Sequence, residues 1–234
     1  MKSVIVDNRI SQTEKNNLKK LGLNIILVPP CNDIGKAISS HPDEVLCKID
    51  RKNLVVYKNI PETFISDLKK SNIKITMSEN TLSQKYPYDI LLNGVTLKNF
   101  FIHNIKFTDP ILYKNISNKI ILNVKQGYSK CSTAVVNDSA IITNDIGISK
   151  SAKKHSIDAL LLPPGDILLP GFDYGFIGGT CGLIDPNTLA FYGNLKKYKY
   201  GNEVLKFLHK YNITPLYLSN DKLIDRGSII CIDS

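Results

Sequence analysis

An aspartate precedes four short apolar stretches that are spread along the chain. These residues are Asp43 in HPDEVLC, Asp89 in YPYDILL, Asp173 in GFDYGFI and Asp225 in LIDRGSI. Four carboxylates brought close together would repel one another, which raises some of their pKa values or requires a cationic guest. Alternatively, each aspartate only accepts hydrogen bonds from the turn before its strand, a common use of this residue. The choice between these functions depends on the elements that position the four side chains.

A repeat in the sequence predicts those elements. Similar extended stretches begin about 40 to 50 residues apart, a spacing typical of a repeated supersecondary unit. They are VIVDN at 4–8, NLVVYKN at 53–59, FFIHN at 100–104, AIITND at 140–145 and LAFYGN at 189–194.

Each repeat continues with a predicted helix and a further strand. In the second repeat, Pro61 stands where the first turn of a helix accepts proline, and Phe64, Ile65 and Leu68 follow at helical spacing. IKITMSE at 73–79 is then an extended run. The last four repeats are also preceded by one more extended stretch, which reads EVLCKID in the second.

Only the first repeat lacks this preceding strand, and the chain ends in SIICID at 228–233. We therefore expect residues 228–233 to supply it, so that the termini meet and five β-β-α-β units close into an α/β propeller. Closure would leave no unpaired sheet edge. An ordinary doubly wound α/β sheet also alternates strands and helices, but paired strands before every helix do not suit it.

Composition predicts one globular domain over residues 1–234, with 43% hydrophobic and 22% charged residues. No stretch approaches the run of about 18 apolar residues that a membrane helix needs. Residues 1–27 also lack the apolar region of a signal peptide, so we expect a cytoplasmic protein without a membrane partner. The five cysteines show no C-x-x-C spacing, which argues against disulfides and a zinc site; no metal or cofactor is expected.

The net charge of +9 raises the question of a nucleic-acid partner, because basic surfaces attract phosphates. The excess is nearly all lysine, with arginine only at Arg9, Arg51 and Arg226, and it is spread along predicted helices beside abundant asparagine and isoleucine. A compositional bias explains this pattern as well. RNA or ribosome binding would require the lysines to gather on one face.

Three segments resemble members of one superfamily. HPDEVLCKID at 41–50 resembles the P-D-x-V-F-x-x-D strand with which dimethylarginine hydrolases and arginine deiminases approach the guanidinium. RGSIICID at 226–233 is similar to the G-G-G-I-H-C-I-T ending of agmatine deiminases. Residues 161–185 resemble a bacterial family of unknown function with the guanidino-modifying-enzyme fold. The chain thus resembles the penteins, whose five-unit ring also occurs in ribosome anti-association factors.

The resemblance implies a mechanism in which a thiolate attacks the guanidinium carbon, a histidine handles protons and carboxylates hold the cation. It places Cys231 at the position of the nucleophile and Asp43 among the carboxylates. Burial among isoleucines would raise the pKa of Cys231 rather than activate it.

Two positions depart from the enzyme pattern. The fourth inner strand, at 174–179, has no histidine, and the position of the second acid falls at Lys48 or Ile49. His41, which lies two residues before Asp43, is the best substitute for the missing histidine.

Glycine and proline mark a candidate binding loop. Gly165 and Gly171 bracket DILLP in a proline-rich loop, which we expect to form a wall or lid of the axial pocket with Asp173 and Tyr174. The glycines at 175–182 match no phosphate-binding motif and indicate a close backbone approach.

The sequence therefore predicts an axial pocket for a small cationic or polar ligand, in a catalytically degenerate relative of the guanidino-modifying enzymes. The predicted lining residues are Asp43, Asp89, Asp173, Tyr174 and Asp225. The alternative is an active cysteine-dependent hydrolase that cleaves a C–N bond of a guanidino compound through Cys231 and His41. A ribosome- or RNA-associated protein is the third interpretation.

Overall fold

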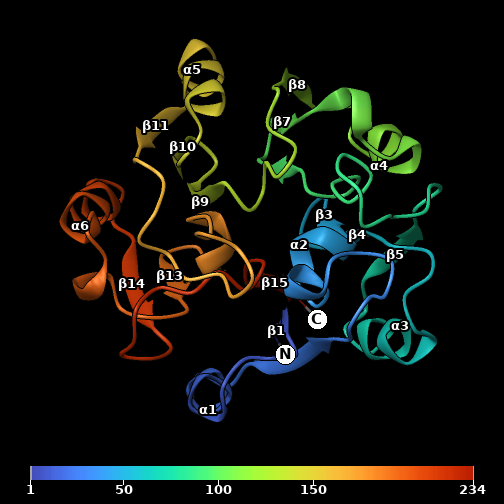
Figure 1. Ribbon diagram of the computed structural model, residues 1–234, viewed down its shortest axis with the longest axis horizontal. Helices are drawn as coiled ribbons and strands as arrows, with labels where there is room; N and C mark the ends of the chain where they lie inside the picture. Colours follow the sequence, from blue (N-terminus) through green and yellow to red (C-terminus); the bar gives the residue numbers. More distant parts are fainter. Residues whose placement is uncertain (1, 234) are drawn as a thin grey trace.

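The computed structural model describes residues 2–233 and shows five three-stranded sheets arranged around one axis (Figure 1). In order around the ring, the sheets contain β15 (Ile230–Asp233), β1 (Lys2–Asp7) and β2 (Asn24–Val28); β3 (Leu46–Lys48), β4 (Asn53–Val56) and β5 (Lys74–Met77); β6 (Val95–Thr96), β7 (Phe100–His103) and β8 (Ile120–Asn123); β9 (Thr133–Asn137), β10 (Ala140–Thr143) and β11 (Asp158–Leu161); and β12 (Cys181–Asp185), β13 (Thr188–Phe191) and β14 (Thr214–Tyr217).

All five sheets have the same topology. The middle strand pairs antiparallel with an inner strand and parallel with an outer strand. In the first sheet, Val4 of β1 lies opposite Cys231 of β15 on one side and Ile25 of β2 on the other. The end of the chain therefore completes the first unit, and the two termini lie close together in Figure 1. This confirms the predicted five-unit α/β propeller.

Six α-helices occur among the described residues: α1 (Gln12–Lys20), α2 (Pro42–Val45), α3 (Glu62–Lys69), α4 (Pro110–Asn115), α5 (Ile146–Lys154) and α6 (Gly201–Lys210). All except α2 connect a middle strand to an outer strand and lie at the rim of the ring (Figure 1). Short 3-10 helices lie at Lys36–Ile38, Ile105–Phe107, Gly178–Thr180 and Leu195–Lys197. None of the helices within residues 2–233 has the length and apolar character required to cross a bilayer.

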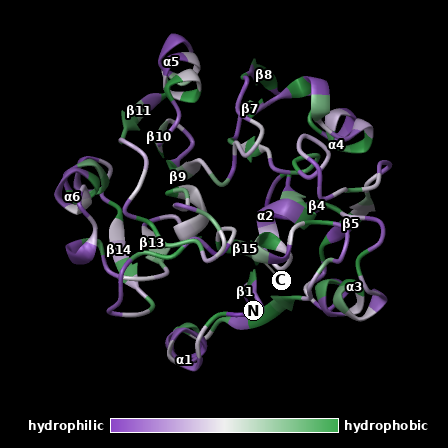
Figure 2. Cartoon of the chain, in the orientation of Figure 1, coloured by the Kyte–Doolittle hydropathy of each residue, from purple (hydrophilic) through white to green (hydrophobic). Residues whose placement is uncertain are grey.

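The rim helices follow from local sequence. Ser11 caps α1 in a capping box with Glu14, which satisfies two backbone N–H groups that the helix leaves open. The predicted spacing in α3 buries Phe64, Ile65 and Leu68 against the ring. Figure 2 shows apolar and polar residues alternating along these helices, as expected for helices with one face on a sheet.

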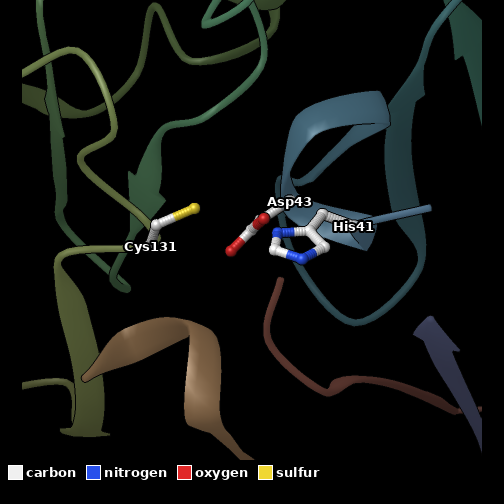
Figure 3. A group of neighbouring side chains, drawn as sticks. All are labelled: His41, Asp43 and Cys131. Atoms are coloured by element: carbon white, nitrogen blue, oxygen red, sulfur yellow. The ribbon is translucent and has the colours of Figure 1, made fainter. Parts of the chain in front are cut away.

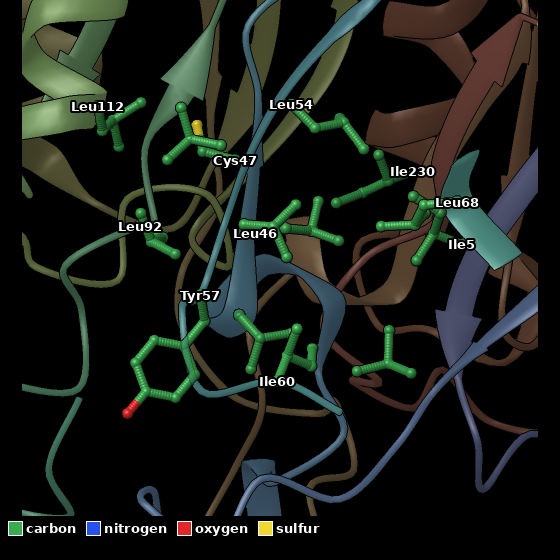
Figure 4. Packing of buried hydrophobic residues seen from close by; sticks show 14 of the residues in the cluster. Ile5, Leu46, Cys47, Leu54, Tyr57, Ile60, Leu68, Leu92, Leu112 and Ile230 are labelled. Carbon is green, nitrogen blue, oxygen red and sulfur yellow. The ribbon is translucent and has the colours of Figure 1, made fainter. Parts of the chain in front are cut away.

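The largest core cluster joins neighbouring units. Figure 4 shows Ile5 and Ile230 of the first unit packed near Leu46 and Leu54 of the second. Because apolar residues from adjacent sheets share this cluster, each unit buries its apolar surface against its neighbours, as in other repeat architectures.

Two inner segments differ from the expected strands. Pro42–Val45 forms the short helix α2, with His41 as its N-cap residue and Pro42 at its first position, so that β3 is shorter than the predicted stretch. Gly178–Thr180 forms a turn of 3-10 helix before β12. At Gly178, an added Cβ would overlap with the backbone of Lys130 and Thr133, so this glycine does mark a close backbone approach.

Candidate functional site

A cavity of about 240 Å³ lies where the segments that precede four of the inner strands meet. Its lining residues are Ile38, His41, Glu44, Tyr128, Cys131, Leu169, Phe172, Asp173, Tyr174, Phe176 and Asp225. Polar residues at its inner end and aromatic residues at its mouth give the cavity two chemically different parts. We call it the acidic cavity.

Three of the four predicted aspartates are buried in or beside this cavity. Asp43, Asp89 and Asp225 have exposed fractions of 1%, 4% and 3%. Asp173 is exposed and lies at the mouth with Tyr174, next to Leu169 of the predicted loop. Asp173, Tyr174 and Asp225 therefore line this cavity, whereas Asp43 and Asp89 lie beside it in contact with lining residues.

Asp43 lies in the first turn of α2. Its Oδ2 accepts a hydrogen bond from Ser228 Oγ at 2.7 Å, whereas its Oδ1 is buried and has no hydrogen-bond partner among the described residues. Burying a carboxylate oxygen without a donor is unfavourable, so this atom is available to a ligand.

Asp225 combines a structural role with a place in the lining of the acidic cavity. Its side chain accepts hydrogen bonds from the backbone N–H groups of Phe176 at 2.9 Å and Gly227 at 3.0 Å, so it organises the turns around it. It also lines the acidic cavity and lies 3.8 Å from the ring of His41. The turn interpretation therefore holds for this residue, and its part in binding a cation stays a prediction.

Asp89 is held by Tyr128, which lines the cavity. Tyr128 donates a hydrogen bond from its hydroxyl to Asp89 Oδ2 at 2.5 Å. The other oxygen, Oδ1, is buried and has no hydrogen-bond partner in the part of the chain that the structure describes. Asp89 thus presents one satisfied and one unsatisfied oxygen, as Asp43 does.

Glu44 is a fourth buried carboxylate, which the sequence analysis did not single out. Its Oε1 accepts hydrogen bonds from Asn93 Nδ2 at 3.0 Å and from Cys131 Sγ at 3.5 Å, and its Oε2 has no hydrogen-bond partner within residues 2–233. The available signal was its position beside Asp43 at the entrance to an apolar strand, where a surface glutamate is not expected.

The carboxylates perturb one another. Burial raises the pKa of Glu44 well above its ordinary value, and the nearby charges of Asp43 and Asp89 raise it further. Burial is also the main reason that the pKa values of Asp89 and Asp225 are raised, and Asp43 adds to the effect on Asp225. Without a bound cation, the cluster therefore favours protonated carboxyl groups.

His41 lies between two acidic side chains. Its Nε2 is 3.8 Å from Asp7 Oδ2, and its Nδ1 is 3.8 Å from Asp225 Oδ1. Both ring nitrogens are buried, and neither has a hydrogen-bond partner among residues 2–233. Asp7 in turn accepts hydrogen bonds from the Arg9 guanidinium. The ring is thus enclosed by charge but free to bond a ligand.

Cys131 is the cysteine of this site. Figure 3 shows its sulfur pointing toward the carboxylate of Asp43, beside the ring of His41. Donor atoms of these three residues lie within 4.8 Å of one another. Burial, and then the charges of Asp43 and Glu44, raise the pKa of the Cys131 thiol well above its ordinary value. Cys131 precedes β9, the one inner strand that the aspartate pattern skipped, and this position was the missed signal.

The predicted pairing of Cys231 with His41 does not form. Strand alternation directs Ile230 and Ile232 into one apolar cluster and Cys231 into another. The Cys231 sulfur donates a hydrogen bond to Ile184 O at 3.4 Å, and the residue lines a different cavity. Cys131, rather than Cys231, therefore supplies the thiol near His41.

This arrangement has two chemical capabilities. The buried carboxylates can hold a cation that carries several N–H donors, because three of their oxygens lack partners. The imidazole, carboxylate and thiol of His41, Asp43 and Cys131 are also a mixed donor set of the kind that binds Zn²⁺ or a similar metal ion.

The sequence profile of a family described as a family of unknown function, DUF6873, matches residues 5–230. The chain belongs to this family. No curated protein sequence matches the chain.

Several solved structures are similar to this chain over most of its length. An amidinotransferase of Microseira wollei, SxtG of the saxitoxin biosynthetic pathway, is 12% identical with a TM-score of 0.52, and the match covers 92% of this chain and 87% of that one. Agmatine deiminase of C. jejuni is 11% identical with a TM-score of 0.51, covering 95% and 90%. DDAH of Pseudomonas aeruginosa, in complex with citrulline, is 10% identical with a TM-score of 0.54, covering 92% of each chain. The chain has the pentein fold of these guanidino-modifying enzymes.

Proposed function

We propose that the acidic cavity binds the guanidino or amidino group of a small cationic ligand. The observation that carries this proposal is the set of three buried carboxylate oxygens without donors, Asp43 Oδ1, Glu44 Oε2 and Asp89 Oδ1. A guanidinium is planar, carries several N–H donors and is weakly hydrated, so it can satisfy such oxygens at a low cost of desolvation.

The mouth of the cavity suits the same class of ligand. Tyr128, Tyr174 and Phe176 form a chain of ring contacts, with centroid separations of 6.4 Å between Tyr128 and Phe176 and 6.2 Å between Tyr174 and Phe176. Aromatic faces attract cations and stack on planar guanidinium groups. A ligand with a short apolar or polar tail would contact these rings.

The structural neighbours support the choice of ligand class. They include an agmatine deiminase and a DDAH in complex with citrulline, which carries a planar ureido group. Because the sequence identities are only 10% to 11%, the ligand of this chain is proposed from its own carboxylates.

A binding function is favoured over catalysis. The pKa of Cys131 is raised, whereas a nucleophilic cysteine requires a lowered one. A second candidate, hydrolysis through Cys131, is favoured by the 4.8 Å grouping with His41 and Asp43. In that case a bound cation would lower the pKa of the thiol by offsetting the negative cluster.

Hydrolysis at Cys131 would proceed in two stages. The thiol gives its proton to His41, and the sulfur attacks the guanidinium carbon to form an S–C bond. The C–N bond then breaks, and the departing amine takes the proton from His41. Water cleaves the S–C bond, which releases a ureido product and restores the thiol.

Calorimetric titration tests binding and catalysis together. We expect millimolar or tighter binding of guanidine, arginine or agmatine, and little binding of urea, which has a similar planar shape but no charge. Asp43→Asn and Glu44→Gln should abolish binding, whereas Asp173→Asn on the rim should weaken it only slightly. Equal binding of urea, or wild-type affinity in Asp43→Asn, would refute the proposal. Ureido product that requires Cys131 but not Cys231 would establish the hydrolase.

A further inference from the structure

A second and larger cavity, of about 810 Å³, lies among the inner strands themselves. Its lining includes Lys48 at the end of β3, Asn137 at the end of β9 and Asp185 at the end of β12. The acidic cavity is lined instead by segments that precede the inner strands. The two cavities therefore lie toward opposite ends of the inner strands. We call the larger one the basic cavity.

Basic side chains outnumber acidic ones in its lining. The basic residues are Lys2, Lys48, Arg51, Lys98, Lys119 and Lys130, and the acidic residues are Asp50, Asp138 and Asp185. Each of the three aspartates accepts a hydrogen bond from a backbone N–H, donated by Lys52, Lys98 and Asn187 respectively. Asp50 and Asp185 stabilise turns in this way, whereas Asp138 joins two neighbouring units, and the lining contains more basic than acidic side chains.

Lys119 is a partly buried cation of this lining on which the charges of Asp50 and Asp138 act without a direct ion pair among the described residues. Its ammonium donates hydrogen bonds to Leu97 O at 2.9 Å and Lys98 O at 3.0 Å, which are both neutral acceptors. Within residues 2–233, no carboxylate lies within ion-pair distance of it. Partial burial lowers the pKa of Lys119, and one of its three N–H groups remains for another acceptor. An anion in the cavity would accept a hydrogen bond from this N–H group and would stabilise the charged form of the ammonium.

Lys130 marks the inner end of the basic cavity. Its ammonium donates a hydrogen bond to Ser228 Oγ at 2.8 Å, again a neutral partner. Ser228 also contacts Asp43, so Lys130 lies on the boundary between the two cavities. Opposite charges on the two sides of this boundary suit ligands of opposite charge.

The remaining walls are apolar and come from several inner strands. They include Leu46, Val135, Leu183, Ile184 and Ile230. An ammonium group at the edge of an apolar wall suits a molecule with an anionic head and an apolar body, since the apolar body leaves water while the head pairs with the ammonium.

We propose that the basic cavity binds a small amphipathic anion, namely a carboxylate, sulfonate or phosphate on an apolar body, since its volume of about 810 Å³ is typical of ligand pockets. Lys119 contacts the anionic head, and the inner-strand side chains contact the apolar body. This site is separate from the acidic cavity and does not depend on the function proposed there.

Fluorescence titration of the full chain with 8-anilinonaphthalene-1-sulfonate tests this proposal, because this dye is an amphipathic anion that brightens in apolar surroundings. N-phenyl-1-naphthylamine serves as the neutral probe. We expect saturable binding of the anionic dye, weakened at least about fivefold in Lys119→Met, as expected for the loss of one ionic contact in aqueous surroundings. The neutral probe should show no such loss, and dodecanoate should displace the anionic dye.

Two controls complete the design. Lys153→Met removes a charge from α5, away from the cavity lining, and should bind the dye like the wild type. Guanidine, the ligand proposed for the acidic cavity, should not displace the dye, so that guanidino binding and dye binding are separate results. Wild-type affinity in Lys119→Met, or equal loss in Lys153→Met, would overturn the proposal. Displacement of the dye by a short RNA but not by dodecanoate would also overturn it and favour a nucleic-acid partner.

Discussion

Ser228 Oγ donates a hydrogen bond to Asp43 Oδ2 at 2.7 Å, although the two residues are 185 positions apart in the sequence. Ser228 lies just before β15, the strand that completes the first unit, and Asp43 lies in α2 before the inner strand of the second. The contact that orients a carboxylate of the acidic cavity therefore forms only when the ring is closed. Fold closure and site assembly are coupled through this pair.

We expect Ser228→Ala to destabilise the fold by about 1 to 3 kcal/mol, the usual cost of leaving a buried partner unsatisfied. Ser228 has a φ of 73°, a left-handed conformation that favours glycine. Ser228→Gly also removes the hydroxyl, but it should cost less because it relieves this strain. Urea unfolding of the two variants measures the difference. If Ser228→Gly is the less stable of the two, the left-handed backbone at this position is not a source of strain.

The raised carboxyl pKa values predict that the stability of the cation-free protein falls as pH rises. Unfolded carboxyl groups lose their protons near pH 4. In the folded state, Glu44, Asp89 and Asp225 keep their protons to higher pH. Above about pH 4 the folded state therefore binds more protons than the unfolded state, and its stability falls as pH rises through the raised pKa values. Thermal unfolding between about pH 6.5 and pH 9 measures this slope, because burial lowers the pKa of His103 to about 4 and so gives the opposite slope at lower pH.

Glu44→Gln should flatten the slope, because it removes the most strongly perturbed carboxyl group and keeps an oxygen that Asn93 can bond. At pH 8 the variant should be more stable than the wild type, by about 1.4 kcal/mol for each unit by which the pKa is raised. The exposed Asp173→Asn should keep the wild-type slope. An unchanged pH dependence of stability in Glu44→Gln would show that the pKa of Glu44 is not raised in the folded state.

Binding of a guanidino cation should release protons. A cation favours the ionised carboxylates, so the raised pKa values of Glu44, Asp89 and Asp225 should fall when it binds. Affinity should therefore increase as pH rises from about 5 toward the raised pKa values. Calorimetry in two buffers that differ in ionisation enthalpy counts the protons. Proton uptake on binding would contradict this account of the cluster.

Gly179 sets the position of Asp225. An added Cβ at this glycine would overlap with the Asp225 carboxylate, and Asp225 bonds the turns on which the cavity is built. We expect Gly179→Ala to lower stability by about 1 to 3 kcal/mol, as overpacking usually does, and to abolish guanidino binding. Gly35→Ala, where an added Cβ meets nothing within 4 Å, is the matched control and should be neutral.

The ring could be predicted because it rests on a repeated local pattern. Each unit carries its own helix and strand signals, such as Phe64, Ile65 and Leu68 in α3, so the order of elements follows from spacing alone. The part played by residues 228–233 could also be inferred, since only the first unit lacked an inner strand. The short helix α2 was missed because Pro42 and the apolar residues after it suit either a strand or a helix start.

The site could be predicted only where it followed the repeat. Asp43, Asp89 and Asp225 were found because they recur at similar positions. Glu44 and Cys131 were not, because each occurs once, and their burial depends on contacts with other units, such as the bond between Asn93 and Glu44. Cys231 was preferred over Cys131 on the strength of a resemblance in the last strand. Which side of that strand Cys231 faces is decided by its packing against Ile184.

The pairing of β15 with β1 also has a consequence for biosynthesis. β1 leaves the ribosome well before its antiparallel partner β15, which is made about 220 residues later at a pace of several residues each second. Throughout that interval one edge of β1 lacks its native partner and can pair with another nascent chain. This edge therefore needs protection until β15 has been made, and substitutions that slow the synthesis of β15 would lower the yield of folded protein without altering its final stability.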